Sequence, residues 1–344
     1  MPSFFRAHRP TLALILVSFL VPNFVVAFQD TVVVRSNDGN GNKVRKGQIT
    51  DWIGNKISLL ANDRTRTIDI DSVVDVQTRW PSELTQAREL ISRNQYREAI
   101  ASYESALSAE SREWVKQIVL SELIQTLDAV ESPQQTTRKF LQLYQLDKQT
   151  RFFHLIPLPW SASGLKSPAE SETAKWMAAK NSLLRLLGAS WQLSGTKRGQ
   201  AVEVLEQLAS DTDTRIAQLA TAQLWRTRVL SAAPQDIERW QIQIENIDSK
   251  LRAGPLLLLA EAQQRNGMKE KAQLSLLKVP ILHPEKKSLA AFALFRCGSI
   301  REDNNGDTNS QPARPANGKA AAIWRELIRD HPTSQYAELA RGKL

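Results

Sequence analysis

The spacing of apolar residues changes abruptly at Trp80-Pro81, and this change constrains the fold more than any other feature. Over residues 31–78, apolar and polar residues alternate with a period of two, which is typical of β-strands with one buried face. From residue 82 onward the period is close to 3.6, which is typical of amphipathic helices. The sequence therefore predicts a small β domain over residues 28–80, followed by helices only.

Five short β-branched segments make up the first region: TVVVR, VRKGQIT, KISLL, RTIDI and SVVDVQT. The separators NDGNGN, DWIGN and ANDRT are rich in the Asn, Asp and Gly residues that tight hairpin turns require. Five such strands predict a small antiparallel barrel, closed so that no strand edge stays bare. Trp52, in the connection DWIGN, is expected either to lie exposed at the barrel mouth or to cover the barrel core.

The order G-x-I-x-D-W-I-G-N-x-I-x-L, followed by I-D-I-x-x-V-x-x-V, resembles SH3-like or Sm-like small barrels. Barrels of this kind serve many functions, so the resemblance implies a fold and no particular activity.

Pro81, Ser82 and Glu83 form a helix start signal. Helices are predicted at roughly 82–94, 96–109, 111–130, 133–148, 169–193, 197–209, 213–231, 234–250, 254–266, 268–279, 285–299 and 319–330. Helices joined by short polar turns, with no strand signal between them, indicate an all-α array.

Part of this array resembles tetratricopeptide repeats. Gly267 at a turn, Ala272 five residues later, Leu276 and then Pro284 match the second half of such a repeat. Three further partial copies are centred on Ala99, Tyr103 and Ala106; on Leu187, Gly188, Trp191, Ala201, Leu205 and Leu208; and on Ala320, Trp324, Leu327 and Pro332. The resemblance implies a mostly α fold, a tetratricopeptide-like α-hairpin solenoid preceded by the small antiparallel β-barrel. Repeat helices are expected over residues 81–300, with final helices over 319–344.

Two other segments are expected to lie outside the folded parts. Residues 301–318 (REDNNGDTNSQPARPANG) are rich in Asn, Gly, Pro and charge, and we expect a disordered insertion there. Residues 1–27 combine Arg6 and Arg9 with the apolar run TLALILVSFLV and small residues before Phe28. This pattern is typical of a cleaved signal peptide, so we expect an exported protein, periplasmic or secreted. Membrane attachment is expected only if the leader is not cleaved.

Charge and cysteine content limit the classes of function. The chain has 45 basic and 36 acidic residues, but the excess is spread along the sequence without a dense basic stripe. For an exported protein this pattern argues against nucleic-acid binding. The lone cysteine, Cys297, lies in an apolar run and is expected to be a buried small side chain.

No local catalytic motif is present. His154, His283 and His331 are not spaced from each other, or from cysteine or carboxylate residues, as metal ligands would be. The nucleophile elbow, the Walker A loop and the dinucleotide-binding glycine pattern are all missing from the sequence. The sequence therefore predicts no catalytic residue, no cofactor and no metal site.

The most unusual segment is FFHLIPLPW at residues 152–160, within a connector of about twenty residues. Pro157 and Pro159 forbid a continuous helix, so an extended chain is expected to bury Phe152, Leu155, Leu158 and Trp160 against neighbouring helices. The alternative is a lid or an occupant of a concave groove. If the alternative holds, the candidate partner-binding residues are Phe153, His154, Leu158 and Trp160, together with Trp52.

Three functions fit these features. The first is a non-catalytic interaction or scaffold protein that binds a protein or peptide partner of the cell envelope through the helical repeats. The second is an exported hydrolase whose active-site residues are dispersed along the chain. The third is an envelope-polymer-binding protein that uses exposed members of the nine tryptophans and the basic surplus. We expect Trp176, Trp191, Trp225, Trp240 and Trp324 to pack between helices instead.

Overall fold

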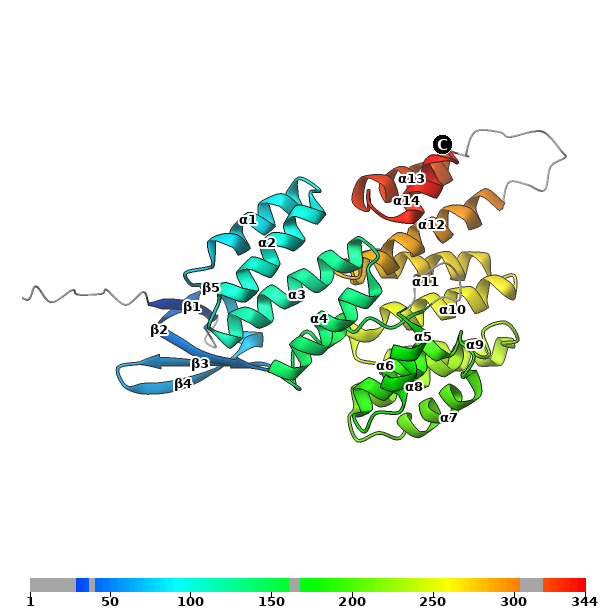
Figure 1. The fold of residues 1–344 in the computed structure, drawn as a ribbon. Helices are drawn as coiled ribbons and strands as arrows, with labels where there is room; N and C mark the ends of the chain where they lie inside the picture. Colours follow the sequence, from blue (N-terminus) through cyan, green and yellow to red (C-terminus); the bar gives the residue numbers. More distant parts are fainter. Residues whose placement is uncertain (1–28, 37–40, 161–167, 304–317) are drawn as a thin grey trace, which may run out of the picture.

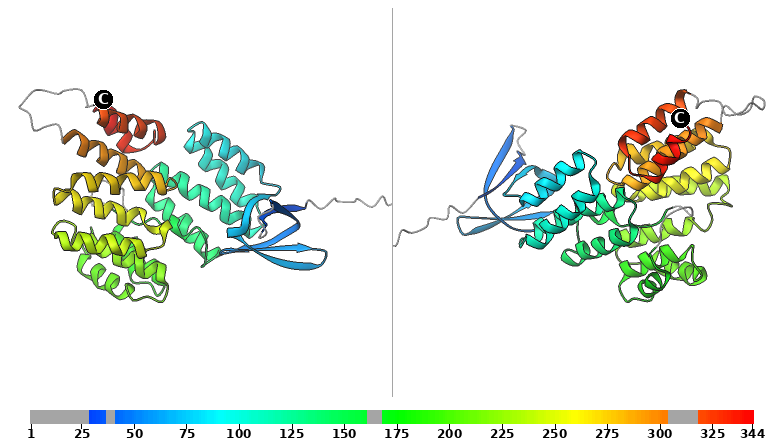
Figure 2. Two further views of the ribbon diagram at one scale, coloured as in Figure 1. Left: turned by 180° about the vertical axis from the view of Figure 1, so that it is seen from behind. Right: turned by 45° about the horizontal axis from the view of Figure 1, so that its top comes forward.

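A computed structural model describes residues 29–36, 41–160, 168–303 and 318–344. The protein is mostly helical, with a five-stranded antiparallel sheet at its N-terminal end (Figures 1 and 2). The last strand ends at Gln77 and the first helix begins at Ser82. The order of sheet and helices predicted from the two periodicities is thus confirmed, and the boundary falls where the spacing changes.

The strands are β1 (Asp30–Arg35), β2 (Asn42–Ile53), β3 (Lys56–Ala61), β4 (Arg64–Asp69) and β5 (Val73–Gln77), and their order in the sheet is β4-β3-β2-β1-β5. The predicted closure into a barrel is wrong, because β4 and β5 are the two outer strands and are not paired with each other. The sheet packs on the neighbouring helix α3 (Glu113–Ala129). There the centroid of the Trp52 ring lies 6.0 Å from that of the Trp114 ring, and the Gln117 side chain donates to the Trp52 carbonyl. Apolar side chains of the sheet that a closed barrel would bury are instead buried against α3.

Strand β2 changes partners halfway along its length. It pairs with β1 as far as Gly47 and with β3 from Gln48 onward. At Gly47 a Cβ would overlap the Leu60 carbonyl, so this close crossing requires glycine. The buried Asp30 carboxylate accepts hydrogen bonds from the Ile49 N–H (2.7 Å) and the Thr78 hydroxyl (2.6 Å). Next to the point where β2 changes partners, the Ile49 N–H therefore has a buried side-chain acceptor.

The described residues hold fourteen α-helices. They are α1 (Ser82–Ser92), α2 (Tyr96–Ala109), α3 (Glu113–Ala129), α4 (Pro133–Leu146), α5 (Glu170–Met177), α6 (Ser182–Gln192), α7 (Arg198–Leu208), α8 (Thr214–Trp225), α9 (Pro234–Asn246), α10 (Ala253–Arg265), α11 (Lys269–Leu282), α12 (Lys287–Asp303), α13 (Gly318–Asp330) and α14 (Gln335–Arg341).

Two regions differ from the expected helix pattern. The single helix expected over 169–193 is two helices, α5 and α6, because the Asn181 side chain accepts from the N–H groups of Leu183 and Leu184 and starts a new helix. Both ends of the expected insertion, 301–318, are helical, since α12 continues to Asp303 and α13 begins at Gly318. Residues 304–317 and the expected leader, 1–27, lie outside the described residues.

Several consecutive helices, among them α5 with α6, α10 with α11 and α12 with α13, pack directly on each other, and small residues allow the close approach. A Cβ at Gly298 of α12 would overlap the Trp324 indole of α13, and one at Gly188 of α6 would overlap the backbone of α5. Gly188 is one of the positions that carry the repeat resemblance, and Gly298 lies against Trp324, which is another. The Cys297 side chain beside Gly298 is buried, and burial raises its pKa to about 11, as expected for a packed thiol.

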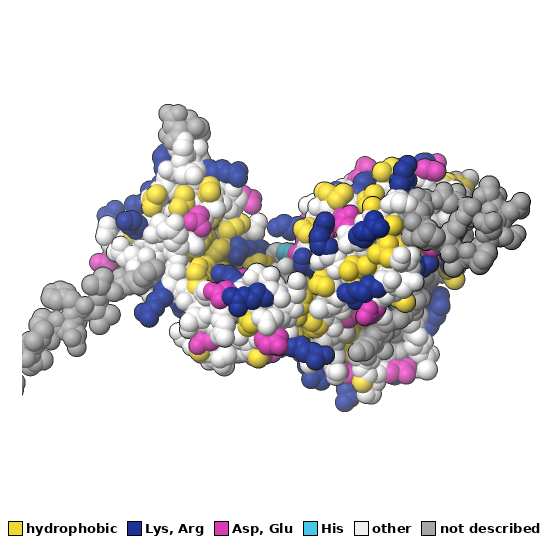
Figure 3. Space-filling model, turned by 90° about the horizontal axis from the view of Figure 1, so that it is seen from above, with side chains coloured by type: hydrophobic (Ala, Val, Ile, Leu, Met, Phe, Trp, Pro, Cys, Tyr) yellow, Lys and Arg dark blue, Asp and Glu magenta, His cyan; other side chains and the backbone are white. Residues whose placement is uncertain are grey.

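Hydrogen bonds join the end of α3 to segments near the C-terminus. The Asp128 carboxylate at the end of α3 accepts from the Ser288 hydroxyl of α12 (2.6 Å), and the Thr333 hydroxyl donates to the Ala129 carbonyl (2.9 Å). Helix α12 therefore packs on α3, and the segment between α13 and α14 is hydrogen-bonded to its end. Seen from above, the surface is hollowed between the part with the sheet and the part with the C-terminal helices, with basic side chains on both sides (Figure 3).

Candidate functional site

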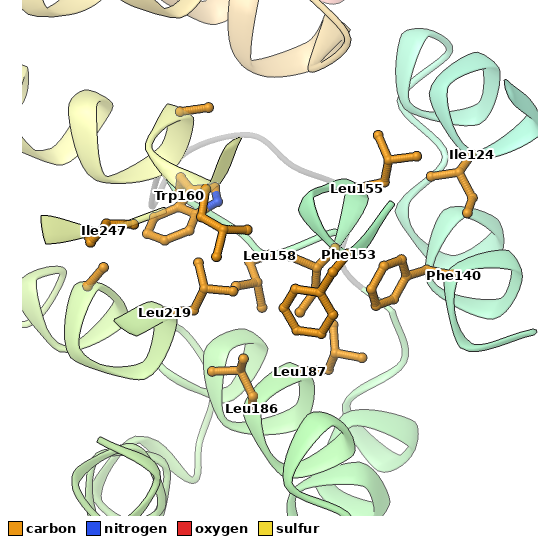
Figure 4. Close-up of a cluster of buried hydrophobic side chains, with 14 of the residues drawn as sticks. Ile124, Phe140, Phe153, Leu155, Leu158, Trp160, Leu186, Leu187, Leu219 and Ile247 are labelled. Carbon is orange, nitrogen blue, oxygen red and sulfur yellow. The ribbon is translucent and has the colours of Figure 1, made fainter. Parts of the chain in front are cut away.

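The connector FFHLIPLPW lies at the centre of the helical region, between α3 and α4 on one side and α6, α8 and α10 on the other (Figure 4). Phe153–Leu155 form one turn of 3-10 helix, and the chain is extended after it. The side chains of Phe153, Leu158 and Trp160 are only 3%, 6% and 5% exposed. The expected burial is confirmed for Leu155, Leu158 and Trp160, but Phe152 is only half-buried and Phe153 takes the buried position.

Side chains from distant helices satisfy the backbone of this proline-containing run. The Pro159 carbonyl accepts from the Gln223 side chain of α8 (3.0 Å), and the Ile156 carbonyl accepts from the Lys286 ammonium (3.1 Å). Such bonds are needed because an extended segment between helices has no neighbouring strand. The Phe140 and Phe153 rings meet edge to face at 6.0 Å.

A cleft of about 630 Å³ opens where this connector meets the sheet. One wall is the β2–β3 turn and its flanks, another is the connector before Leu155, and a third combines the start of α8 with a 3-10 turn at Ser249–Leu251. Its lining residues are Asp51, Ile53, Gly54, Asn55, Lys56, Ser58, Thr67, Gln149, Thr150, Arg151, Phe153, His154, Arg215, Asp248, Lys250 and Leu251. The volume is in the range of ligand pockets.

Asp147 fixes the two sides of this cleft to each other. Its buried carboxylate accepts from the Gly54 N–H (2.8 Å) in the β2–β3 turn and from the Gln149 N–H (2.8 Å) in the connector. Gly54 has a φ of +51°, a left-handed conformation that favours glycine. The turn is therefore held in place by the helical part of the chain.

Arg151 is the most unusual side chain in the cleft. Its guanidinium lies 3.7 Å from the Trp52 ring centroid and 4.5 Å from that of Phe152. Burial lowers the pKa of Arg151 to about 10, so the group is still charged at neutral pH. Within the described ranges, no hydrogen bond or ion pair joins this guanidinium to another residue.

Arg215 provides a contrast within the same cleft. Its guanidinium lies 4.0 Å from the Phe153 ring centroid, but it also pairs with the Asp213 carboxylate (2.7 Å) and donates to the Lys148 carbonyl (3.0 Å). The charge of Arg215 is therefore compensated by Asp213, whereas no described acidic residue pairs with Arg151.

His154 separates this cleft from a second one of about 610 Å³ between α9, α10 and α11, and it lines both. Its Nδ1 lies 3.2 Å from the Arg151 carbonyl, a geometry that places the proton on Nδ1. Burial, followed by the nearby Lys286 ammonium, lowers the pKa of His154 to about 4. The ring is therefore neutral at neutral pH, with Nε2 as an acceptor.

The second cleft contains a histidine–carboxylate pair. His283 Nδ1 lies 3.8 Å from Glu285 Oε1, and although burial acts in the opposite direction, this contact helps to lower the pKa of Glu285. Among the described residues, no serine, threonine or cysteine side chain is hydrogen-bonded to His154, His283 or His331. The described part of the chain likewise holds no cluster of three metal-ligating side chains.

The structure separates the five candidate residues into two groups. Phe153 and His154 line the cleft, whereas Leu158, Trp160 and Trp52 are buried in the core. Trp52 thus has the covering role. Sequence reasoning missed Arg151 and Gly54, and the only signal was an arginine directly before an apolar run and a glycine in a hairpin turn.

The tryptophans are packing residues. All nine lie in the described ranges, and each is buried or half-buried. Trp225 and Trp240 stack in parallel with their ring centroids 5.0 Å apart, and both are buried. The packing expected for Trp225, Trp240 and Trp324 is confirmed by their burial.

Comparisons with protein-family models, curated proteins and solved structures found no match to this chain. A search of the described helices for a stretch long and apolar enough to cross a membrane found none. The class that the fold defines is a mostly helical protein with an N-terminal five-stranded antiparallel sheet.

Proposed function

We propose that this chain is a non-catalytic, exported interaction protein that holds a protein or peptide partner in the cleft between sheet and helices. The observation that carries the proposal is the Arg151 guanidinium, which pairs with no described acidic residue, in a cleft whose walls come from the sheet, the connector and two helical segments. A preformed cleft that contains a charged group available to a ligand is typical of a binding site. Binding of this kind needs no nucleophile.

We also propose that the helices form a tetratricopeptide-like solenoid. In the α10–α11 pair, Ala260 and Ala272 are buried at the expected contact positions, and Gly267 at the turn has a φ of +74°. These features support a repeat hairpin at residues 253–282, where the small side chains let the two helices approach. Arrays of this kind usually supply binding surfaces rather than catalytic groups.

The test is site-specific photo-crosslinking in the native host. A photoreactive amino acid at Gln149, which is exposed in the cleft, is expected to cross-link a partner. The same residue at Glu206, exposed on α7 and outside both clefts, serves as the matched control. Equal labelling from the two positions would contradict the proposal.

The proposed export is tested on protein purified from the native host. N-terminal sequencing of protein from the native host is expected to begin near Phe28, because a signal peptidase would cut after the small residues before it. A chain that still begins at Met1 would contradict both cleavage and the simple exported state.

A further inference from the structure

Arg151 has a hydrogen-bonding capacity that the described residues do not use. A guanidinium carries five N–H donors in one plane. The Trp52 and Phe152 rings lie against this group, and rings that stack on a guanidinium occupy its faces and leave its edges free. The edges are where paired N–H groups match the two oxygens of a carboxylate.

The position of the Arg151 charge also lowers the stability of the fold. Burial lowers the pKa of Arg151 to about 10, which means that the surroundings disfavour the cation. A buried charge is normally paired, and one without a partner destabilises the fold. Binding proteins tolerate such a cost at the place where a ligand supplies the missing charge.

The surroundings of Arg151 point to more than one acidic group on the ligand. Lys56 and Lys250 also line the cleft, and no ion pair joins either ammonium group to another described residue. The lining also holds two acidic residues, Asp51, which accepts from the Trp52 N–H (2.7 Å), and Asp248, which accepts from the Lys250 N–H (2.9 Å). Its four basic residues, Lys56, Arg151, Arg215 and Lys250, therefore outnumber the acidic ones by two. Ile53, about half exposed, adds apolar surface at the rim.

We propose that Arg151 receives a carboxylate of the partner, and that the cleft takes an acidic peptide segment. Lys56 and Lys250 bind further acidic side chains of the same segment. This inference rests on the proposed function, because it specifies the chemistry of the partner that enters the cleft.

The probe is a fluorescent peptide of ten glutamates, and decaglutamine is its neutral counterpart. Binding to the purified full chain is measured by fluorescence anisotropy. The test variant is Arg151→Met, which keeps apolar contact with the two rings. The matched control is Arg97→Met, which removes one exposed charge from α2 outside both clefts.

We expect decaglutamate to bind and decaglutamine to bind much more weakly. Arg151→Met is expected to weaken decaglutamate binding by about 30-fold or more, as for loss of one partner of a buried charge pair. Arg97→Met is expected to change it by less than about twofold, since exposed charges contribute little. The melting temperature of Arg151→Met should be unchanged or higher, because the variant removes an uncompensated cation.

Four outcomes would overturn the inference. Equal weakening by both variants would mean general charge attraction. A fall of several degrees in the melting temperature of Arg151→Met would make the guanidinium a structural clamp. Tighter binding of a phosphoserine peptide than of decaglutamate would reassign the site to phosphate. A partner cross-linked from Gln149 together with no decaglutamate binding would leave the proposed function intact and remove only the acidic-peptide assignment.

Discussion

The indole ring of Trp160 packs directly against Gly254, near the start of α10, so closely that a Cβ at that position would overlap the ring. The two residues belong to different parts of the fold: Trp160 ends the proline-containing connector, and Gly254 lies in a helix whose neighbouring side chains are also buried. The end of the connector can therefore lie in the core only because Gly254 has no side chain.

Replacing Gly254 with alanine should destabilise the protein by about 1–3 kcal/mol, the usual cost of overpacking a core. The measurement is urea unfolding followed by circular dichroism. Gly199→Ala on α7 is the matched control, because a Cβ there meets nothing within 4 Å. That control should lose no stability, since alanine favours a helix over glycine. Similar losses in the two variants would mean that Trp160 does not pack as described.

Leu158→Ala should lower the free energy of unfolding by about 2–5 kcal/mol, because it leaves a cavity among buried side chains. Serine at Leu158 or Trp160 should cost more, since it also buries a hydroxyl. Leu230→Ala is the control, as Leu230 is 68% exposed. Thermal melting and cross-linking from Gln149 should fall together in the Leu158 variants. Unchanged melting with lost cross-linking would make Leu158 a contact residue.

Acidification should destabilise the fold between about pH 6.5 and pH 4. Burial, followed by the Lys287 charge, lowers the pKa of His331 to about 4, and burial with Lys286 does the same for His154. The unfolded state therefore binds more protons in this window, so stability is complete above pH 6.5 and falls as the pH drops.

The nearly buried His331 alone should account for about 1 kcal/mol between pH 7.5 and pH 5.5. Urea unfolding at these two pH values measures the loss. His331→Gln should reduce it, because glutamine does not titrate. An identical pH dependence in the variant would show that His331 does not contribute.

Asp30→Ala should cost about 1–3 kcal/mol, because it leaves the buried Ile49 N–H without an acceptor. Asp75→Ala removes an exposed carboxylate from β5 of the same sheet and should have little effect. The comparison is made by thermal melting. If the two variants melt alike, the Asp30 carboxylate does not stabilise the change of strand partners.

Local patterns in the sequence were enough to predict the order of the fold. The alternation through β1 to β5 and the 3.6-residue period after Trp80-Pro81 gave the sheet, the helices and the boundary between them, because side-chain direction repeats with the backbone. The proline content and apolar character of residues 152–160 were likewise enough to predict burial, since so apolar a run cannot stay in water. The break between α5 and α6 was missed because the Asn181 cap competes with helix continuation over a few residues only.

Tertiary structure alone decided the rest. Whether the sheet closes depends on what covers it, and Trp114 and Gln117 of α3 cover Trp52 from a distant part of the chain. The cleft exists because Asp147 ties the Gly54 turn to the connector. Arg151 is unusual only through its surroundings, because in the sequence it is one arginine among many. Its stacking on Trp52, with no acidic partner among the described residues, follows from which segments meet around it. Charge pairing and burial depend on such long-range contacts, which residue spacing does not encode.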